Sequence, residues 1–307
     1  MPERPLDKLL DREYAENFIS ENFSDAQYLL QQLTNYGTIL IARCMETSNK
    51  GLEDIIVLGT MLKQAVEMLD SVDRLFSVGC INPAFLQLRV IYELHLFIKW
   101  ILASDTKNKA RHYYVWNLLV EIKWHKIIIN GTPESAELES WFKNHNLWEK
   151  YQSDEVQQLA KKRIEDIEEE LNKTELIPIY ASFKNGKVNR WYKPLNVKSL
   201  RHLTEILNCK DEYLFIYDTC SKIVHSSSYE YHISSTGDTV GFKTIRNPEN
   251  IIMLLSFLIP LILRIYRYIL KFYRPEEIEN FKRKYIEEWR SKFLIILQTE
   301  FKYNIQK

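Results

Sequence analysis

Turn-forming residues are scarce along this chain, which has only eight glycines and nine prolines among 307 residues. The long intervals between them carry apolar residues three and four positions apart, which is the period of an amphipathic helix. We therefore expect an all-α fold, a large bundle of long antiparallel helices with at most a short β-hairpin. The predicted helices cover 24–47, 52–78, 83–103, 107–129, 134–145, 153–172, 198–207, 211–226, 248–273 and 275–301.

Two stretches interrupt this helical pattern, at 176–194 and 229–245. Each combines turn residues with β-branched and aromatic residues, so each is expected to form a short hairpin or an ordered loop. For the domain organisation, residues 1–50 are expected to form an N-terminal helical segment. We expect this segment to pack on a helical bundle domain, residues 51–307, and to share one continuous core with it.

Charge and cysteine usage exclude several classes of protein. The 41 lysines and arginines balance 41 acidic residues, so bulk charge cannot hold this chain on nucleic acid or on an anionic membrane. The four cysteines form no C-x-x-C pair, and the histidines show no metal-ligand spacing, so neither a metal site nor a cofactor is expected. The charged N-terminus lacks the apolar core of a signal peptide, which predicts a cytoplasmic protein.

The most apolar segment lies at 251–270 and reads IIMLLSFLIPLILRIYRYIL. Its uncharged part ends at Leu263, before Arg264 and Arg267, after thirteen residues. A membrane-spanning helix needs about 20 apolar residues, so we expect a helix buried in the bundle and no membrane partner. The alternative is a membrane-embedded helix whose arginines reach back to the interface.

The first candidate site lies in the predicted helix 83–103, which is apolar nearly all round. Arg89 and Glu93 are four residues apart and therefore share one face of this helix. A charge removed from water costs several kcal/mol unless it is paired, so we expect the two side chains to bind each other or a third group. They form either an internal ion pair that fixes helix register or part of a catalytic or ligand site.

The second candidate site lies near the end of the predicted helix 211–226. Asp218, Ser221 and His225 recur at intervals of three and four, so they form one polar stripe on an otherwise apolar helix. His225 falls in the last turn, where the helix dipole favours the imidazolium, which suits a general acid or base. A capping or core role for His225 is the alternative.

A third candidate is the stretch 184–201, which holds six basic residues and no acidic one. Lys187 and Arg190 could hold phosphates, and Trp191 and Tyr192 could stack on bases. The alternative is an ordinary basic loop whose tryptophan fills the core. No P-loop, G-x-G-x-x-G, G-x-S-x-G or H-E-x-x-H motif occurs in the chain.

The spacing of several of these residues resembles an uncharacterised bacterial all-helical family that is known only as a domain of unknown function. The resemblance covers about 71–227 and implies a helical bundle in which Arg89, Glu93 and His225 converge. No established activity accompanies it. The residues that carry it are Leu88, Arg89, Glu93, Arg190, Trp191, Ser199, Leu200, Tyr217, Ser221, Val224, His225 and Ser226.

A second, weaker resemblance is to the HEPN domains of bacterial toxins and abortive-infection proteins. These small helical bundles are often metal-independent ribonucleases with an arginine followed, after four to six residues, by a histidine. Arg89 and His95 have this spacing, although Val90 stands where a polar residue is usual. The resemblance implies that Arg89 stabilises the pentacovalent phosphate and that His225 or His95 moves the 2′-OH proton.

Two hypotheses for the function follow from these features. The first is a HEPN-like, metal-independent ribonuclease or nucleotide-handling effector in anti-phage defence, with RNA or a nucleotide as its partner. The second is a non-enzymatic interaction or sensor module, acting as a homodimer or with a partner protein, in which a buried network of Arg89, Glu93 and His225 is structural. A membrane-active effector that uses the apolar segment 251–270 is a third alternative.

Overall fold

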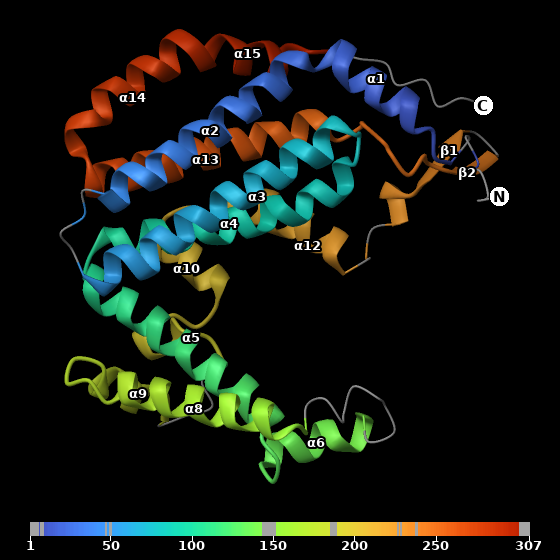
Figure 1. The fold of residues 1–307 in the computed structure, drawn as a ribbon. Coiled ribbons are helices and arrows are strands. Elements are labelled where there is room, and N and C mark those ends of the chain that lie inside the picture. Colours follow the sequence, from blue (N-terminus) through green and yellow to red (C-terminus); the bar gives the residue numbers. More distant parts are fainter. Residues whose placement is uncertain are drawn as a thin grey trace. The chain divides into compact units, whose positions relative to one another are not determined.

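Helices dominate the fold of this chain, which we describe from a computed structural model (Figure 1). The structure describes residues 6, 9–46, 48, 51–142, 152–184, 189–225, 227, 229–236 and 239–300. Within these residues the all-α prediction is confirmed, and one two-stranded antiparallel sheet is present. The expected helix ends at 47, 145, 226 and 301 lie outside the described residues.

Contacts divide the chain into two compact units, residues 1–104 with 201–307 and residues 105–200. The first unit holds the long helices α2 (Ser24–Glu46), α3 (Gly59–Ser77), α4 (Ile81–Ala103) and α13 (Ile251–Tyr273). Its shorter elements are α1 (Arg12–Asn22), η1 (Glu53–Leu58), α10 (Leu200–Ile206), α11 (Lys210–Glu212), η3 (Tyr213–Tyr217), α12 (Asp218–Val224), η4 (Tyr229–Tyr231), η5 (Pro275–Glu277), α14 (Ile278–Lys284), η6 (Tyr285–Trp289) and α15 (Arg290–Gln298). The first residue of α10, Leu200, is the last residue of the second unit.

The second unit is smaller and is built around α5 (Thr106–Ile128). Helices α6 (Pro133–Phe142), α8 (Asp154–Leu171) and α9 (Ile177–Lys184) each pack on α5. A short 3-10 turn, η2 (Lys193–Leu195), follows within the stretch that carries the candidate basic residues. The basic stretch lies in the second unit except for its last residue, Arg201, whereas Arg89, Glu93 and His225 belong to the first unit.

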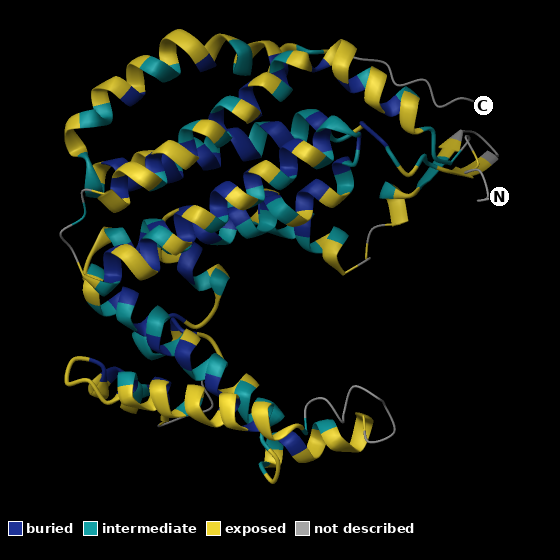
Figure 2. Cartoon of the chain, in the orientation of Figure 1, coloured by how far each residue is buried: buried dark blue, intermediate teal, exposed yellow. Residues whose placement is uncertain are grey.

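The core of the first unit forms where α4 packs between α3 and α13. Figure 2 shows buried residues along all three helices. Eleven side chains of α13 are buried, so the apolar segment 251–270 is largely interior to the unit, and the helix continues through Pro260. With a mean hydropathy of 1.8, α13 is also the one helix among the described residues that is long and apolar enough to cross a membrane.

Of the two predictions for irregular stretches, the one for 229–245 was confirmed and the one for 176–194 was wrong. The stretch 229–245 contains the hairpin of β1 (Ile233–Thr236) and β2 (Thr239–Phe242), as expected. For 176–194 the prediction of a hairpin or loop was wrong, because α9 forms there. Ile179 and Phe183 are four residues apart and both buried, which is the helical period that the β-branched composition concealed.

Residues 1–50 were expected to be helical, but no bounds were predicted for helix α1, although its N-terminus carries a recognisable cap. The Asp11 carboxylate accepts a hydrogen bond from the Tyr14 backbone N–H at 2.9 Å. Ala15 and Ile19, four residues apart, are both buried. A cap followed by two apolar residues at this spacing is the signal that could have located the helix.

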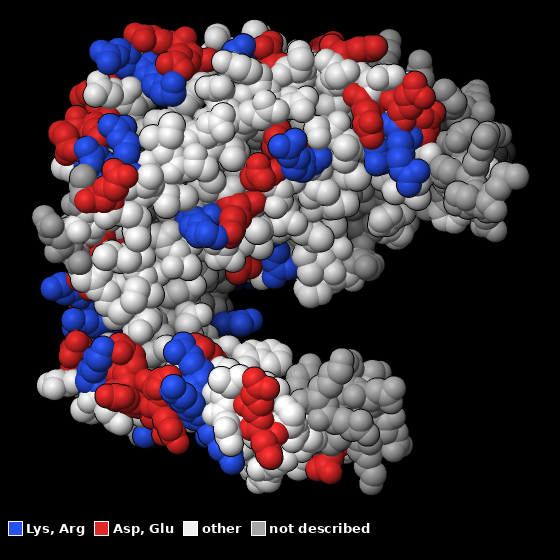
Figure 3. Space-filling model, viewed as in Figure 1, with Lys and Arg blue, Asp and Glu red and all other residues white. Residues whose placement is uncertain are grey.

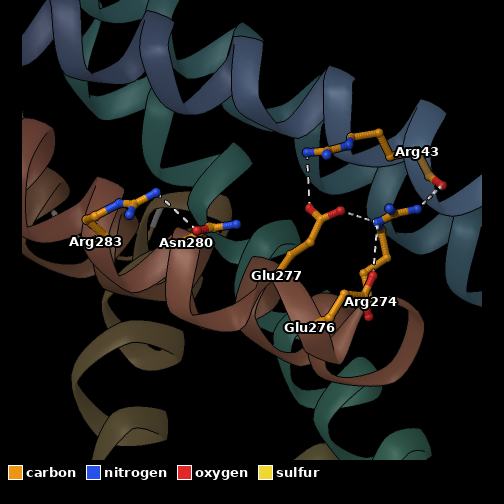
Figure 4. Close-up of polar contacts among 6 residues, drawn as sticks. All are labelled: Arg43, Arg274, Glu276, Glu277, Asn280 and Arg283. Carbon is orange, nitrogen blue, oxygen red and sulfur yellow. Dashed lines mark hydrogen bonds and ion pairs between the residues drawn. The ribbon is translucent and has the colours of Figure 1, made fainter.

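An ion-pair network joins the C-terminal end of α2 to the turn after α13. Glu277 lies between Arg43 and Arg274 in Figure 4. Its carboxylate accepts from Arg43 Nη1 at 3.0 Å and also from Arg274 Nε. This shared acceptor fixes the direction in which the chain leaves α13.

Basic and acidic side chains are interspersed over the face seen in Figure 3. No broad area of one sign appears on that face, in keeping with the balance of charges in the sequence. Recognition of a charged partner would therefore depend on a few local groups.

Candidate functional site

Arg89 and Glu93 meet on α4, as their spacing predicts. Arg89 Nε donates to Glu93 Oε1 at 3.3 Å, and the two side chains are 19% and 35% exposed. A second partner comes from 128 residues along the chain, since Arg89 Nη2 donates to the Tyr217 hydroxyl at 2.6 Å. The guanidinium carbon also lies 4.5 Å from the centroid of the Tyr217 ring, a cation–π arrangement. Arg89 therefore ties α4 to η3.

Tyr217 is positioned by the π-helical turn η3, which leads directly into α12. Its ring stacks on Tyr213 with centroids 4.7 Å apart and an interplanar angle of 15°. Burial raises the pKa of the Tyr213 hydroxyl, which keeps it neutral. Sequence reasoning noted Tyr217 in a family pattern but gave it no role, because nothing local marks it as the partner of Arg89.

Helices α4 and α12 run antiparallel where they pack together. Arg89 meets Tyr217, and seven residues away in each helix Asn82 and Val224 line the same cavity. A helix rises 1.5 Å per residue, so Asn82 and Glu93 are separated by about 16 Å along α4. Glu93 and the C-terminal end of α12 therefore lie at different levels of the bundle.

His225 caps the C-terminal end of α12 with an exposed side chain. Within the described residues no hydrogen bond or ion pair joins it to Arg89 or Glu93. Asp218 and Ser221 lie half-buried on α12, and neither is bonded to Arg89 in this part of the chain. Convergence of these side chains on one ligand group stays a prediction.

His95, the histidine of the HEPN spacing, lies in the core of the first unit with 0% exposure. Its ring stacks on Tyr268 with centroids 5.8 Å apart and lies 6.5 Å from Tyr92. Burial, reinforced by the nearby Arg264 and Lys99, lowers the pKa of His95 to about 3. A neutral imidazole without access to solvent cannot relay a proton to a substrate, so His95 is not the base that this resemblance implies.

A cavity with a volume of about 640 Å³ borders α4, α12 and the hairpin. Such a volume is typical of pockets that hold small molecules. Asn82 Oδ1 is buried here and has no hydrogen-bond partner in the described part of the chain. The lining consists of Leu9, Asn82, Pro83, Leu86, Ile223, Val224, Tyr231, His232, Phe242, Lys243, Thr244 and Ile245.

The basic stretch 184–201 has a different structure from the one that base stacking requires. Trp191 and Tyr192 are only 4% and 6% exposed, and Trp191 packs edge-to-face on Tyr113 with centroids 5.4 Å apart. Both rings belong to the core of the second unit, which corrects the expectation that they stack on bases. Arg190 is exposed, and Lys187 lies outside the described residues.

No cluster of three or more histidine, cysteine, aspartate or glutamate side chains suited to a metal ion occurs among the described residues. The buried thiol of Cys220, close to Arg89, illustrates why the cysteines offer little chemistry. Burial raises its pKa to about 12, so the reactive thiolate is not formed near neutral pH.

Comparison with known proteins places this chain in a family. Residues 54–240 match a family of unknown function, DUF5677. The chain belongs to this family. The matched range contains Arg89, Glu93, Tyr217 and His225, so the resemblance to an uncharacterised family is confirmed. The comparisons give no support to the likeness to HEPN domains. No curated protein and no solved structure matches the chain.

Proposed function

We propose that this DUF5677 protein is a non-enzymatic sensor module that binds a small molecule in the cavity between α4, α12 and the hairpin. The observation that carries the proposal is this cavity of about 640 Å³, whose lining includes Asn82. The amide oxygen of Asn82 is buried and has no hydrogen-bond partner among the described residues. A buried acceptor without a partner costs about 1–3 kcal/mol, which a ligand that donates a hydrogen bond to it would recover.

The Arg89 network supports a structural role for the residues that sequence reasoning singled out. The Arg89 guanidinium binds Glu93 and Tyr217 within the unit, so it is engaged in holding α4 against η3. An arginine that stabilises a transition state would need donors aimed at the substrate.

The chemistry of the lining indicates the class of ligand. Aliphatic and aromatic side chains predominate, and the ammonium of Lys243 is paired with Glu249 at 2.6 Å, so the basic charge near the cavity is compensated. We therefore expect a largely apolar, uncharged ligand with one donor group for Asn82. Binding would then be sensed through the contact between α12 and α4.

A fluorescent apolar probe, N-phenyl-1-naphthylamine, tests the cavity. The wild type should bind the probe, and Leu86→Trp, which places a large ring in the cavity, should weaken binding at least tenfold. Ile286→Trp is the matched control, because Ile286 is an exposed apolar residue of η6 outside the lining. Equal binding by both variants, or none by the wild type, would contradict the proposal.

A ribonuclease or nucleotide-handling effector in anti-phage defence is the second candidate, and one observation favours it. His225 is exposed and directly follows Val224, which lines the cavity, so a nucleotide bound there would have an imidazole nearby. In this case the wild type should cleave RNA, and His225→Ala should abolish cleavage with little change in Tm. Absence of cleavage by the wild type under conditions where it binds the probe would leave the sensor proposal in place.

A further inference from the structure

One face of α5 in the second unit is covered only in part by α9 among the described helices. Trp124 is 65% exposed, which is unusual for the largest apolar side chain, and Lys123 beside it is exposed as well. Together with Trp116, Leu119, Val120 and Ile127, these residues recur at helical spacing and form one stripe. The opposite face, with Val115, Leu118 and Ile122, is buried.

This stripe forms the floor of a groove with a volume of about 560 Å³. Phe183 of α9 and Asn189 complete the lining. The Phe183 and Trp116 rings lie 5.9 Å apart at 37°, so they support each other. Trp124 has no ring partner in the described part of the unit, which leaves its indole face open for stacking.

Among the described residues that line the groove, the ionised one is basic. Lys123 is the single ionised residue among the described residues that line it, and Arg190, exposed next to Asn189, adds a second cation nearby. The nearest acidic residue on α5, Glu121, forms an ion pair with Arg163 of α8 at 2.6 Å. Its charge is therefore compensated at the contact with α8.

We propose that this groove binds single-stranded nucleic acid, with a base stacked on Trp124 and an adjacent phosphate held by Lys123. Aromatic faces beside cations are the elements that hold single strands without reading their sequence. A duplex hides its base faces, so it cannot make the stacking contact. A purely apolar peptide would offer the Lys123 ammonium no acidic group or hydrogen-bond acceptor in its side chains. The inference is independent of the proposed sensor cavity, because the two sites lie in different units.

Fluorescence anisotropy of labelled U12 and dT12 oligonucleotides, measured on the full chain at several salt concentrations, tests the proposal. Trp124→Ala should weaken binding about tenfold, the size expected for loss of one stacked base. Lys123→Met should lower the slope of log K against log[salt] by about 0.7, the value for one phosphate contact on a single strand. A third oligonucleotide, dU12, differs from U12 only in the 2′-OH, so comparison of these two tells whether the 2′-OH contributes.

Trp141→Ala is the matched control, since Trp141 is 73% exposed on α6 and does not line the groove. It should bind the oligonucleotides as the wild type does, and circular dichroism should show that all variants keep their helix content. The proposal is overturned if the wild type binds none of the oligonucleotides at low salt, or if Trp124→Ala and Trp141→Ala have equal effects. Displacement of a groove-bound dye by an amphipathic peptide but not by U12 would also overturn it, in favour of a protein partner.

Discussion

Replacement of His95 by phenylalanine should remove much of the acid sensitivity of this protein. His95 is fully buried between aromatic rings, and neither of its ring nitrogens has a hydrogen-bond partner in the described residues. Protonation would bury a cation without a partner, and it would do so near two other cations, Arg264 and Lys99. Burial first, and then these two charges, lower the pKa of His95 from 6.5 to about 3. Phenylalanine keeps a planar ring there and cannot be protonated.

The sign and size of the effect follow from proton linkage. Below pH 6.5 His95 becomes protonated in the unfolded chain, whereas in the folded chain it stays neutral down to about pH 3. The contribution of His95 to the free energy of unfolding is thus complete above pH 6.5 and is lost as the pH falls. The loss approaches about 1.4 kcal/mol for each pH step well below pH 6.5, and it sums to about 2.7 kcal/mol between pH 7.5 and 4.5.

Urea unfolding at pH 7.5, 6.5, 5.5 and 4.5 measures this difference. His95→Phe should lose about 2.7 kcal/mol less than the wild type between pH 7.5 and 4.5, whatever its stability at neutral pH. Ile286→Ala, which removes an exposed side chain that cannot be protonated, should follow the wild-type curve. Parallel pH profiles for wild type and His95→Phe would refute the reasoning, because they would show that His95 is protonated equally well in the folded chain.

Two further substitutions test the packing of the first unit. Tyr217→Phe keeps the ring over Arg89 but removes the hydroxyl acceptor, and it should cost about 1 kcal/mol in urea unfolding; no change would mean that the hydrogen bond contributes nothing. Gly37→Ala would place a methyl carbon 2.3 Å from the Tyr266 hydroxyl and should cost about 1–3 kcal/mol, whereas Gly51→Ala meets nothing closer than 3.5 Å and should be near neutral. Equal stability of the two alanine variants would contradict the close packing of α2 on α13.

The helices could be predicted because their apolar residues repeat over long intervals. In α13 the apolar run is interrupted by Arg264 and Arg267, and the structure buries the aliphatic side chains on either side of them. Helix α9 could not be predicted in the same way. Its eight residues hold only two buried positions, too few for the period to outweigh the β-branched and aromatic composition.

The sequence did not predict which individual aromatic residues are buried and which are exposed. Trp191 lies between basic residues and looked available for stacking, yet Tyr113 and the core of the second unit cover it. Trp124 was singled out by no sequence pattern, yet it is exposed. The sequence defines which face of α5 is apolar but not which other helix covers that face, and this decides which tryptophan can meet a ligand.

The Arg89 network also bears on where the folding unit of the family ends. The matched range 54–240 includes Arg89, Glu93 and Tyr217, so the contact that ties α4 to η3 lies inside it. Helix α13 lies outside this range, although it packs along α4 and buries eleven of its own side chains. Without α13, the apolar surface of α4 that it covers would face water, at about 25 cal/mol for each Å² exposed. The matched range thus carries the polar network, whereas part of the apolar packing around α4 comes from a helix outside that range.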